Sequence, residues 1–148
     1  MKVLVARVSK GCVSVGGKIH SSIERGIAVF AGIEPHDREQ TLIEMAQKIT
    51  NLRIFENEEG KLHYSVKDKS YQVLCISNFT LCADTKKGRR PSFENAMEPV
   101  KANRLFENFV LILKSMGNRV CTGAFGKHMD ISLDLDGPVN ITLESSRL

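Results

Sequence analysis

The sequence predicts an α+β fold, a single domain of mainly antiparallel or mixed β-sheet with two main helices. Strand-like apolar runs cluster at both ends of the chain, and two segments between them carry apolar residues at helical spacing. No repeat, linker or low-complexity tract divides the 148 residues, of which 42% are hydrophobic. A chain of this size and composition can bury one substantial core. We therefore expect one domain over residues 1–148.

The first third of the chain reads as strands joined by short turns. The strand-like runs cover residues 3–8, 12–15, 19–23 and 27–31. Between the second and third runs lies Gly16-Gly17, and both residues can adopt positive φ without a Cβ clash. This pair predicts a hairpin.

Two helices are predicted from apolar periodicity. Leu42, Met45, Ala46 and Ile49 recur at helical spacing, which predicts a helix over about 38–50 that Asp37 could cap. A longer apolar stripe predicts a second helix over 99–116, ended by Gly117. We assign both stripes to the core.

The remaining elements are predicted strands. Residues 52–55 form a short one, followed by a turn at 57–60, and the β-rich run 71–81 reads as a central strand. Near the C-terminus, 129–136 and 139–144 alternate apolar and polar residues on either side of Gly137-Pro138. These two strands would flank a Gly-Pro corner, and because most X-Pro bonds are trans, the residues alone predict a trans bond there.

The composition argues against a metal centre and a disulfide framework. The four cysteines and four histidines are scattered, with no Cys-x-x-Cys pair and no zinc-like spacing. Cysteines in apolar runs act as small hydrophobes. The N-terminal apolar run meets Arg7 long before it reaches the length of a signal peptide or membrane span. We expect a cytoplasmic protein with no metal, no cofactor and no membrane partner.

Positive charge is concentrated in one loop. Lys and Arg outnumber Asp and Glu by 21 to 17, and Lys86, Lys87, Arg89 and Arg90 lie within five residues of one another. Such a run is often only a solvated surface. Beside a functional site, however, it favours contact with nucleic-acid phosphates.

The sequence contains no familiar activated nucleophile. There is no Gly-x-Ser-x-Gly elbow, no Ser-x-x-Lys and no Gly-rich nucleotide loop. Ser77 to Leu81 form a polar interruption at the end of the central run, where Thr80 has no nearby His or Lys in sequence to activate it. The backbone amides of Phe79 and Thr80 are better candidates, as donors to an oxyanion.

At these residues the chain resembles the D-aminoacyl-tRNA deacylase family, and the similarity runs nearly end to end. The matching segments are 7–9, 51–56, 77–81, 83–85 through 90–93, 122–123 with 125–126, and 136–139. The resemblance implies a barrel-like homodimer that hydrolyses the ester bond of mischarged D-aminoacyl-tRNA. No protein nucleophile would be needed, because the terminal ribose 2′-OH would assist the attacking water.

The resemblance also assigns the site residues. The site would be shared across subunits, with the Ser77 to Leu81 segment of one facing a Gly-cis-Pro dipeptide of the other. The carbonyls of Gly137 and Pro138 would bind the substrate amino group and exclude an L side chain, whereas glycyl-tRNA(Ala) would be accepted. The implied catalytic residues are Ser77, Asn78, Phe79 and Thr80, and the implied residues of substrate binding and chiral selection are Gly137, Pro138, Met129 and Arg7. Arg7 would hold the Gly-Pro loop, and Lys86, Lys87, Arg89 and Arg90 would contact the tRNA.

Four residues depart from the family pattern near this pocket. Asn78 replaces Gln, Ala6 replaces Gln, and Leu135 and Asn140 replace Asn and Thr beside the Gly-Pro dipeptide. These changes bear on the rate of this protein and leave the dipeptide intact. Two alternatives therefore stay open: a diverged enzyme acting mainly on glycyl- or other misacylated tRNA, and a tRNA-binding protein that has lost catalysis.

Overall fold

The computed structural model describes residues 1–148 and confirms the predicted α+β class. One mixed, nearly closed sheet follows the strand order β2-β1-β3-β6-β7, and β8 pairs with β1. Its strands are β1 (Lys2–Val15), β2 (Lys18–Ile23), β3 (Gly26–Gly32), β6 (Gln72–Ser77), β7 (Arg119–Thr122) and β8 (Asp130–Glu144). A separate small sheet pairs β4 (Phe55–Glu56) with β5 (Leu62–Tyr64). The larger sheet carries the elements of the candidate site.

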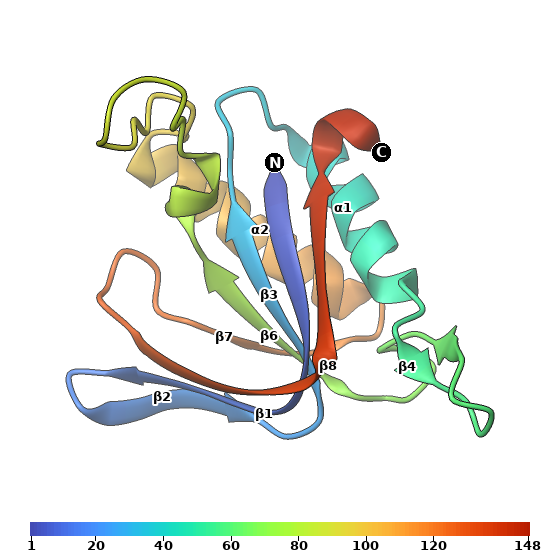
Figure 1. Ribbon diagram of the computed structural model, residues 1–148. Helices are drawn as coiled ribbons and strands as arrows, with labels where there is room; N and C mark the ends of the chain where they lie inside the picture. The colour runs from blue at the N-terminus through green and yellow to red at the C-terminus, as the bar shows by residue number, and fades with distance from the viewer.

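Two helices cover one side of the large sheet. The chain runs from β3 through α1 (Glu39–Asn51) to β6, and from β6 through α2 (Pro99–Ser115) to β7. Because β3, β6 and β7 are parallel, each connection must cross over the sheet, and a helix makes that crossing. Figure 1 shows both helices behind the curved strands. Neither helix is long and apolar enough to cross a membrane.

Both faces of the central strands are buried, in two separate cores. Val29 and Cys75 pack with the helices in the larger core, whereas Ala28, Leu74 and Ile76 belong to a smaller core on the concave side of the sheet. This arrangement explains why 27–31 and 71–77 read as continuous apolar runs rather than alternating ones. The predicted helical stripes of α1 and α2 lie in the larger core, as expected, except for Val100 at the start of the α2 stripe, which is exposed.

Strand β1 organises the whole sheet. Its first half pairs with β3 and its second half with β2, through the hairpin predicted at Gly16-Gly17, where both φ angles are positive. Along nearly its whole length β1 also pairs with β8. The two strand runs predicted at 3–8 and 12–15 are therefore one strand, as are the two predicted around Gly137-Pro138. Figure 1 shows β1 and β8 bending together.

Three further sequence predictions are wrong in detail, and two strands were missed. Arg38, not Asp37, stands at the N-cap of α1, because the Asp37 carboxylate accepts the Glu34 amide and pairs with the Met1 α-amino group. Strand pairing in the 52–55 region begins only at Phe55, and the strands β5 and β7 were not predicted. The run 71–81 leaves the sheet at Ser77 and continues as a 3₁₀ helix, η1 (Phe79–Cys82). A second 3₁₀ turn, η2 (Ser145–Arg147), ends the chain.

Candidate functional site

The principal hollow of the molecule, which we call the main cavity, lies at the carboxyl end of β6 and has a volume of ≈ 780 Å³. Ser77, Asn78, Phe79 and Thr80 line it together with Met129. Most of the remaining wall is apolar and comes from β3, the start of α2 and the loop before β8, with Phe30, Phe93, Phe106 and Phe125 as its aromatic members. The size suits a small organic ligand with a few polar contacts.

The polar end of the main cavity is built by one side chain. The backbone N–H of Asn78 donates to the Ala31 carbonyl at 2.8 Å. The side-chain oxygen of Asn78 accepts hydrogen bonds from the backbone N–H of Thr80 at 3.2 Å and from the Thr80 hydroxyl at 2.5 Å. This local bonding draws the chain away from the strand and starts η1. The shorter Asn78 is thus occupied within its own turn.

The backbone amides of Phe79 and Thr80, both expected as oxyanion donors, differ in whether they already have a hydrogen-bond partner. The Thr80 amide donates to Asn78. Phe79 is the first residue of η1, so its amide has no partner within the helix. Thr80 gives its hydroxyl proton to an amide oxygen rather than to a base. Phe79 therefore supplies the available backbone donor, and Thr80 is not arranged as a nucleophile.

The position of η1 depends on close packing against β3. A Cβ atom added to Gly32 would lie 2.9 Å from both the Asn78 carbonyl oxygen and the Cys82 sulfur. Only glycine allows the backbone to approach so closely. Close packing at the end of β3 therefore fixes the position of the Asn78–Thr80 turn at the main cavity.

The thiols near the site are protonated at neutral pH. Burial raises the pKa of the Cys82 thiol to about 11, and burial raises the pKa of Cys75 further. All four cysteines are free. No group of three or more metal-ligating side chains occurs in the structure.

Three polar residues of the main cavity were not predicted from the sequence. Glu98, Lys127 and His128 line its rim. The Glu-Pro pair at the start of the second predicted helix could have revealed Glu98, whose carboxylate accepts the Val100 and Lys101 amides as the N-cap of α2. Nothing in the spacing of Lys127 and His128 points to this cavity, since a loop brings them there. His128 is almost fully exposed and lies 3.8 Å from Asp130.

Gly137 and Pro138 lie where β8 leaves its pairing with β1. The register passes from Ala6 opposite Asn140 to Val8 opposite Leu135, so the single residue Arg7 faces four residues of β8. Such an excess makes the strand bulge. The bulge, residues 136–139, carries the Gly137-Pro138 bond, which is cis, as the resemblance implied and contrary to the base-rate expectation. Both residues are exposed.

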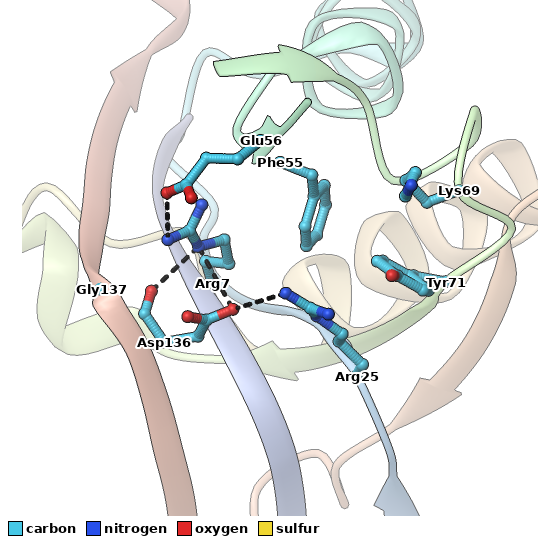
Figure 2. Close-up of a pocket in the computed structure, with 8 residues that line it drawn as sticks. All are labelled: Arg7, Arg25, Phe55, Glu56, Lys69, Tyr71, Asp136 and Gly137. Carbon is cyan, nitrogen blue, oxygen red and sulfur yellow. Dashed lines mark hydrogen bonds and ion pairs between the residues drawn. The ribbon is translucent and has the colours of Figure 1, made fainter. Parts of the chain in front are cut away.

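The Arg7 side chain fills the gap in the ladder. It is 5% exposed, and each of its three nitrogens donates a hydrogen bond. Nε bonds the Asp136 carbonyl at 2.9 Å, one terminal nitrogen bonds the Ile54 carbonyl at 2.8 Å, and the other bonds the Glu56 carboxylate at 3.2 Å. Figure 2 shows this buried guanidinium between Glu56 and Asp136. Arg7 thereby ties the base of the bulge to β4.

A smaller hollow of ≈ 340 Å³ lies beside the bulge, and Arg7, Asp136 and Gly137 line it. No residue lines both hollows. The predicted site residues therefore fall into two groups within one chain: Ser77 to Thr80 with Met129 at the main cavity, and Arg7 with Gly137 at the smaller hollow. Met129, which was grouped with Gly137 and Pro138 from the sequence, lies in the other group.

The basic loop, residues 85–91, follows η1 directly. A pair of backbone hydrogen bonds between Asp84 and Ser92, of 2.8 and 2.9 Å, closes its base. Lys86, Lys87, Arg89 and Arg90 are all exposed, and none has a carboxylate within ion-pair distance. Directly after the loop, Phe93 packs edge-on against Phe79 at 4.9 Å at the mouth of the main cavity. The four cations are thus unpaired beside that mouth.

Comparisons with known proteins agree on one family. The family model described as D-Tyr-tRNA(Tyr) deacylase matches residues 4–144. The chain is 46% identical over 148 residues to the D-aminoacyl-tRNA deacylase of Aquifex aeolicus (strain VF5), covering 100% of both chains. It is 45% identical over 148 residues to the enzyme of the same name from Thermotoga petrophila (strain ATCC BAA-488 / DSM 13995 / JCM 10881 / RKU-1), covering 100% of this chain and 99% of that one.

Solved structures show the same architecture. One, a c-Myc DNA unwinding element binding protein, superposes with a TM-score of 0.92 at 42% identity, over 97% of this chain and 98% of the other. Another, described as a probable eukaryotic D-amino acid tRNA deacylase, has a TM-score of 0.85 at 15% identity over 96% and 97% of the two chains, and shows the fold alone. The full-length family match and the identity to the two bacterial relatives establish that this chain belongs to the D-aminoacyl-tRNA deacylase family.

Proposed function

We propose that this protein hydrolyses the ester bond of D-aminoacyl-tRNA and releases the D-amino acid and free tRNA. The observation that carries the proposal is the main cavity itself. It has the size for an aminoacyl group with its terminal adenosine, and a polar end at Asn78 to Thr80 without an activated side-chain nucleophile. An ester that brings its own neighbouring hydroxyl suits such a site.

The chemistry would then depend on positioning and charge stabilisation. Water attacks the ester carbonyl while the ribose 2′-OH assists, and the bond to the ribose 3′-oxygen breaks. The Phe79 amide, which has no partner within η1, would donate to the oxyanion that develops on the carbonyl oxygen. The Thr80 hydroxyl, with its proton committed to Asn78, can only accept a hydrogen bond from the substrate.

The complete site would require a second copy of the chain. Gly137 and Pro138 are exposed on a bulge and lie outside the main cavity of their own chain. The same strand exposes the apolar residues Ile131 and Leu135, at 37% and 52%. Pairing of two copies would cover these side chains and bring the bulge of one subunit to the main cavity of the other.

Gly137 and Pro138 would act as the chiral filter of that shared site. Their carbonyl oxygens would accept hydrogen bonds from the substrate amino group. With the amino group and ester both fixed, an L side chain would collide with the wall, whereas the α-hydrogen of a D-residue would not. Glycine has no side chain to collide, so glycyl-tRNA(Ala) would also be hydrolysed.

The tRNA would be held at the mouth of the main cavity. The four unpaired cations of the basic loop can contact backbone phosphates, and the exposed rings of Phe79 and Phe93 can stack on a base. Arg7 would act indirectly, by holding the base of the bulge. The basic loop and the two phenylalanine rings, which would contact the tRNA, lie within one segment, from η1 to Phe93.

The direct test is hydrolysis of matched tRNA esters. Purified protein should release D-tyrosine from D-Tyr-tRNA and leave L-Tyr-tRNA intact, and it should also deacylate glycyl-tRNA(Ala). Equal release of both tyrosine enantiomers would contradict the chiral filter. Salt-dependent tRNA binding without turnover would instead support the alternative of a binding protein that has lost catalysis.

A further inference from the structure

We propose that Arg25 is a positioning residue for chiral selection, acting with Arg7 to fix Asp136 and thereby the direction in which Gly137 and Pro138 present their carbonyls. The inference rests on the proposed role of that dipeptide. It concerns a second, partly exposed arginine at the smaller hollow, which contacts the same Asp136 carboxylate as Arg7.

The geometry centres on one carboxylate oxygen. Oδ2 of Asp136 lies 3.3 Å from a terminal nitrogen of Arg25 and 3.5 Å from Nε of Arg7. Figure 2 shows the two guanidinium groups meeting at this carboxylate, Arg7 from β1 and Arg25 from the turn before β3. Arg7 also holds the Asp136 carbonyl. Asp136 is therefore anchored through both its backbone and its side chain.

Arg25 is itself held in place, although 57% of its side chain is exposed. Its carbonyl accepts the Gln72 amide at 3.2 Å, and the preceding Glu24 amide donates to the Gln72 side chain at 3.0 Å. Its guanidinium lies over the Tyr71 ring, 5.5 Å from the centroid. The neighbouring Gly26 packs so closely that an added Cβ would overlap the Gln72 carbonyl oxygen. These contacts limit the directions that Arg25 can take.

The bulge has few other anchors. The ladder between β1 and β8 has no paired residue from Asp136 to Val139. Gly137 has no side chain, and its φ of +137° lies in a region that other residues rarely adopt. The direction of the dipeptide therefore depends strongly on the residue before it. A carboxylate held by two arginines limits the rotation of Asp136, and hence the spread of directions available to the Gly137 carbonyl.

The consequence concerns discrimination more than rate. Rejection of an L side chain needs a wall that does not yield, whereas a D-substrate fits whether or not the wall moves slightly. Loss of the Arg25 contact should therefore raise hydrolysis of the L-ester while changing that of the D-ester little. A partly exposed ion pair contributes modestly, so we expect the ratio of D- to L-Tyr-tRNA hydrolysis to fall by about two- to fivefold.

The experiment compares Arg25→Gln with Arg104→Gln, which removes an exposed arginine on α2 that has no ion-pair partner. The measured quantity is the ratio of kcat/KM for D- and L-Tyr-tRNA, because effects on tRNA binding cancel when the tRNA is shared. Raising the ionic strength should lower this ratio in the wild type towards that of Arg25→Gln, since salt screens a partly exposed pair. The ratio of Arg25→Gln should not respond to salt.

An unchanged ratio in Arg25→Gln, with the same melting temperature as the wild type, would overturn the inference. An equal fall in the ratio for Arg104→Gln would also overturn it. Pro138→Ala separates this failure from failure of the proposed function. If Pro138→Ala lowers the ratio and Arg25→Gln does not, the filter stands and Arg25 has no part in it. If neither variant changes the ratio, the proposed role of the dipeptide fails as well.

Discussion

Arg7 shows how a single buried charge can connect distant parts of the chain. Its guanidinium bonds residues of β4, of the segment before β4, and of the β8 bulge. Each of these oxygens would be left without its charged donor if the side chain were removed. The stability of the fold and the geometry of the bulge therefore depend on the same three hydrogen bonds of Arg7.

Arg7→Met should lower stability clearly. The change keeps much of the side-chain volume but removes the charged donor from the buried Ile54 carbonyl and the half-buried Asp136 carbonyl, which costs about 2–3 kcal/mol. For a chain of this length, that loss corresponds to a fall in Tm of roughly 5–10 °C in thermal unfolding followed by circular dichroism. Arg104→Gln, at an exposed position, is the control and should leave Tm unchanged. Equal Tm values for Arg7→Met and the wild type would show that the three hydrogen bonds of Arg7 contribute nothing to stability.

Thr80→Ala should reduce kcat by less than about tenfold. The hydroxyl donates to Asn78 and contacts no base, so its loss removes one local hydrogen bond, worth about 1 kcal/mol, and no nucleophile. Steady-state deacylation of D-Tyr-tRNA measures the effect, and Thr80→Ser should retain most of the wild-type rate. Complete loss of turnover in a folded Thr80→Ala protein would restore the nucleophile as an explanation.

At the scale of residues, the sequence predicts the members of the proposed site but not its hydrogen bonds. The motif residues 77–81 and 137–138 are readable, and the shortened Asn78 is visible as a departure. The hydrogen bond from the Thr80 amide to Asn78 forms only because the strand ends at Ser77. The sequence does not show this end, because the β-rich run continues through Leu81. Likewise, Met129 alternates with Ile131 as if both belonged to a strand, but Met129 lies just before β8, and both side chains line the main cavity.

Among the elements, helix α2 has the clearest pH dependence. Hydrogen bonds from the Val100 and Lys101 amides hold the pKa of Glu98 below its ordinary 4.5. A lowered pKa in the folded state means that the carboxylate stabilises the fold above its unfolded-state pKa. This contribution is lost as the pH falls through the folded-state value.

Glu98→Ala should therefore lower Tm at pH 7 and have a smaller effect near pH 3. At pH 7 the variant loses an ionised cap, whereas the wild-type carboxylate takes up a proton and loses its stabilising charge as the pH falls through its folded-state pKa. Melting curves of both proteins across this range measure the difference. Glu98→Gln keeps an acceptor oxygen without the charge, so its Tm at pH 7 should lie between those of the wild type and Glu98→Ala. A difference in Tm that is independent of pH would show that the cap acts without its charge.

Removing the charge of the basic loop should weaken tRNA binding in a salt-dependent way. Changing Lys86, Lys87, Arg89 and Arg90 to Ala should raise KM for D-Tyr-tRNA and reduce the slope of log affinity against log salt by up to about three, as for contacts to single-stranded phosphates. The kcat should change little. Lys18, Lys48, Lys61 and Arg104, which are exposed and outside the basic loop, provide a control variant of equal charge. An equal salt slope in both variants would argue against phosphate contact by this loop.

Long periodic elements could be predicted from the sequence, whereas short ones could not. Helix α1 differs from its predicted bounds by one residue at each end and α2 by one residue at its C-terminal end, because their apolar stripes span several turns. The strands β4 and β5 have two and three residues and depend on pairing with each other, for which local sequence carries little signal. Strand β7 was missed because its four residues are only partly buried at the edge of the sheet.

At the scale of the whole molecule, the two halves of the proposed site lie in different hollows of one chain. Sequence spacing could not reveal this, because the separation follows from how β8 runs along β1 and where its register shifts. Only the family resemblance implied a site shared between two subunits. The exposed apolar residues of β8 give that expectation a physical basis.

Leu135→Asp should shift the protein towards monomers. Leu135 is 52% exposed on β8, and burial of a carboxylate in an apolar contact is costly unless it is paired. Sedimentation velocity over a range of concentrations measures the shift, which should accompany loss of deacylation. Leu111→Asp, at a 63% exposed position on α2, is the matched control and should behave as the wild type. A monomeric wild-type protein with full activity would contradict the shared site.

The pairing of β1 with β8 also has a consequence for synthesis of the protein. These strands are joined from Lys2 opposite Glu144 to Ser14 opposite Asp130, so the first strand made must wait for the last. Contacts so distant in sequence form slowly, and an unpaired strand edge is a template for association with other chains. A ribosome that stalls before residue 130 would leave the longest edge of the sheet uncovered. Such a fragment would carry most of the main cavity but neither β8 nor the Gly137-Pro138 dipeptide, so it could not complete the proposed site, and its open edge would favour aggregation and removal of the unfinished chain.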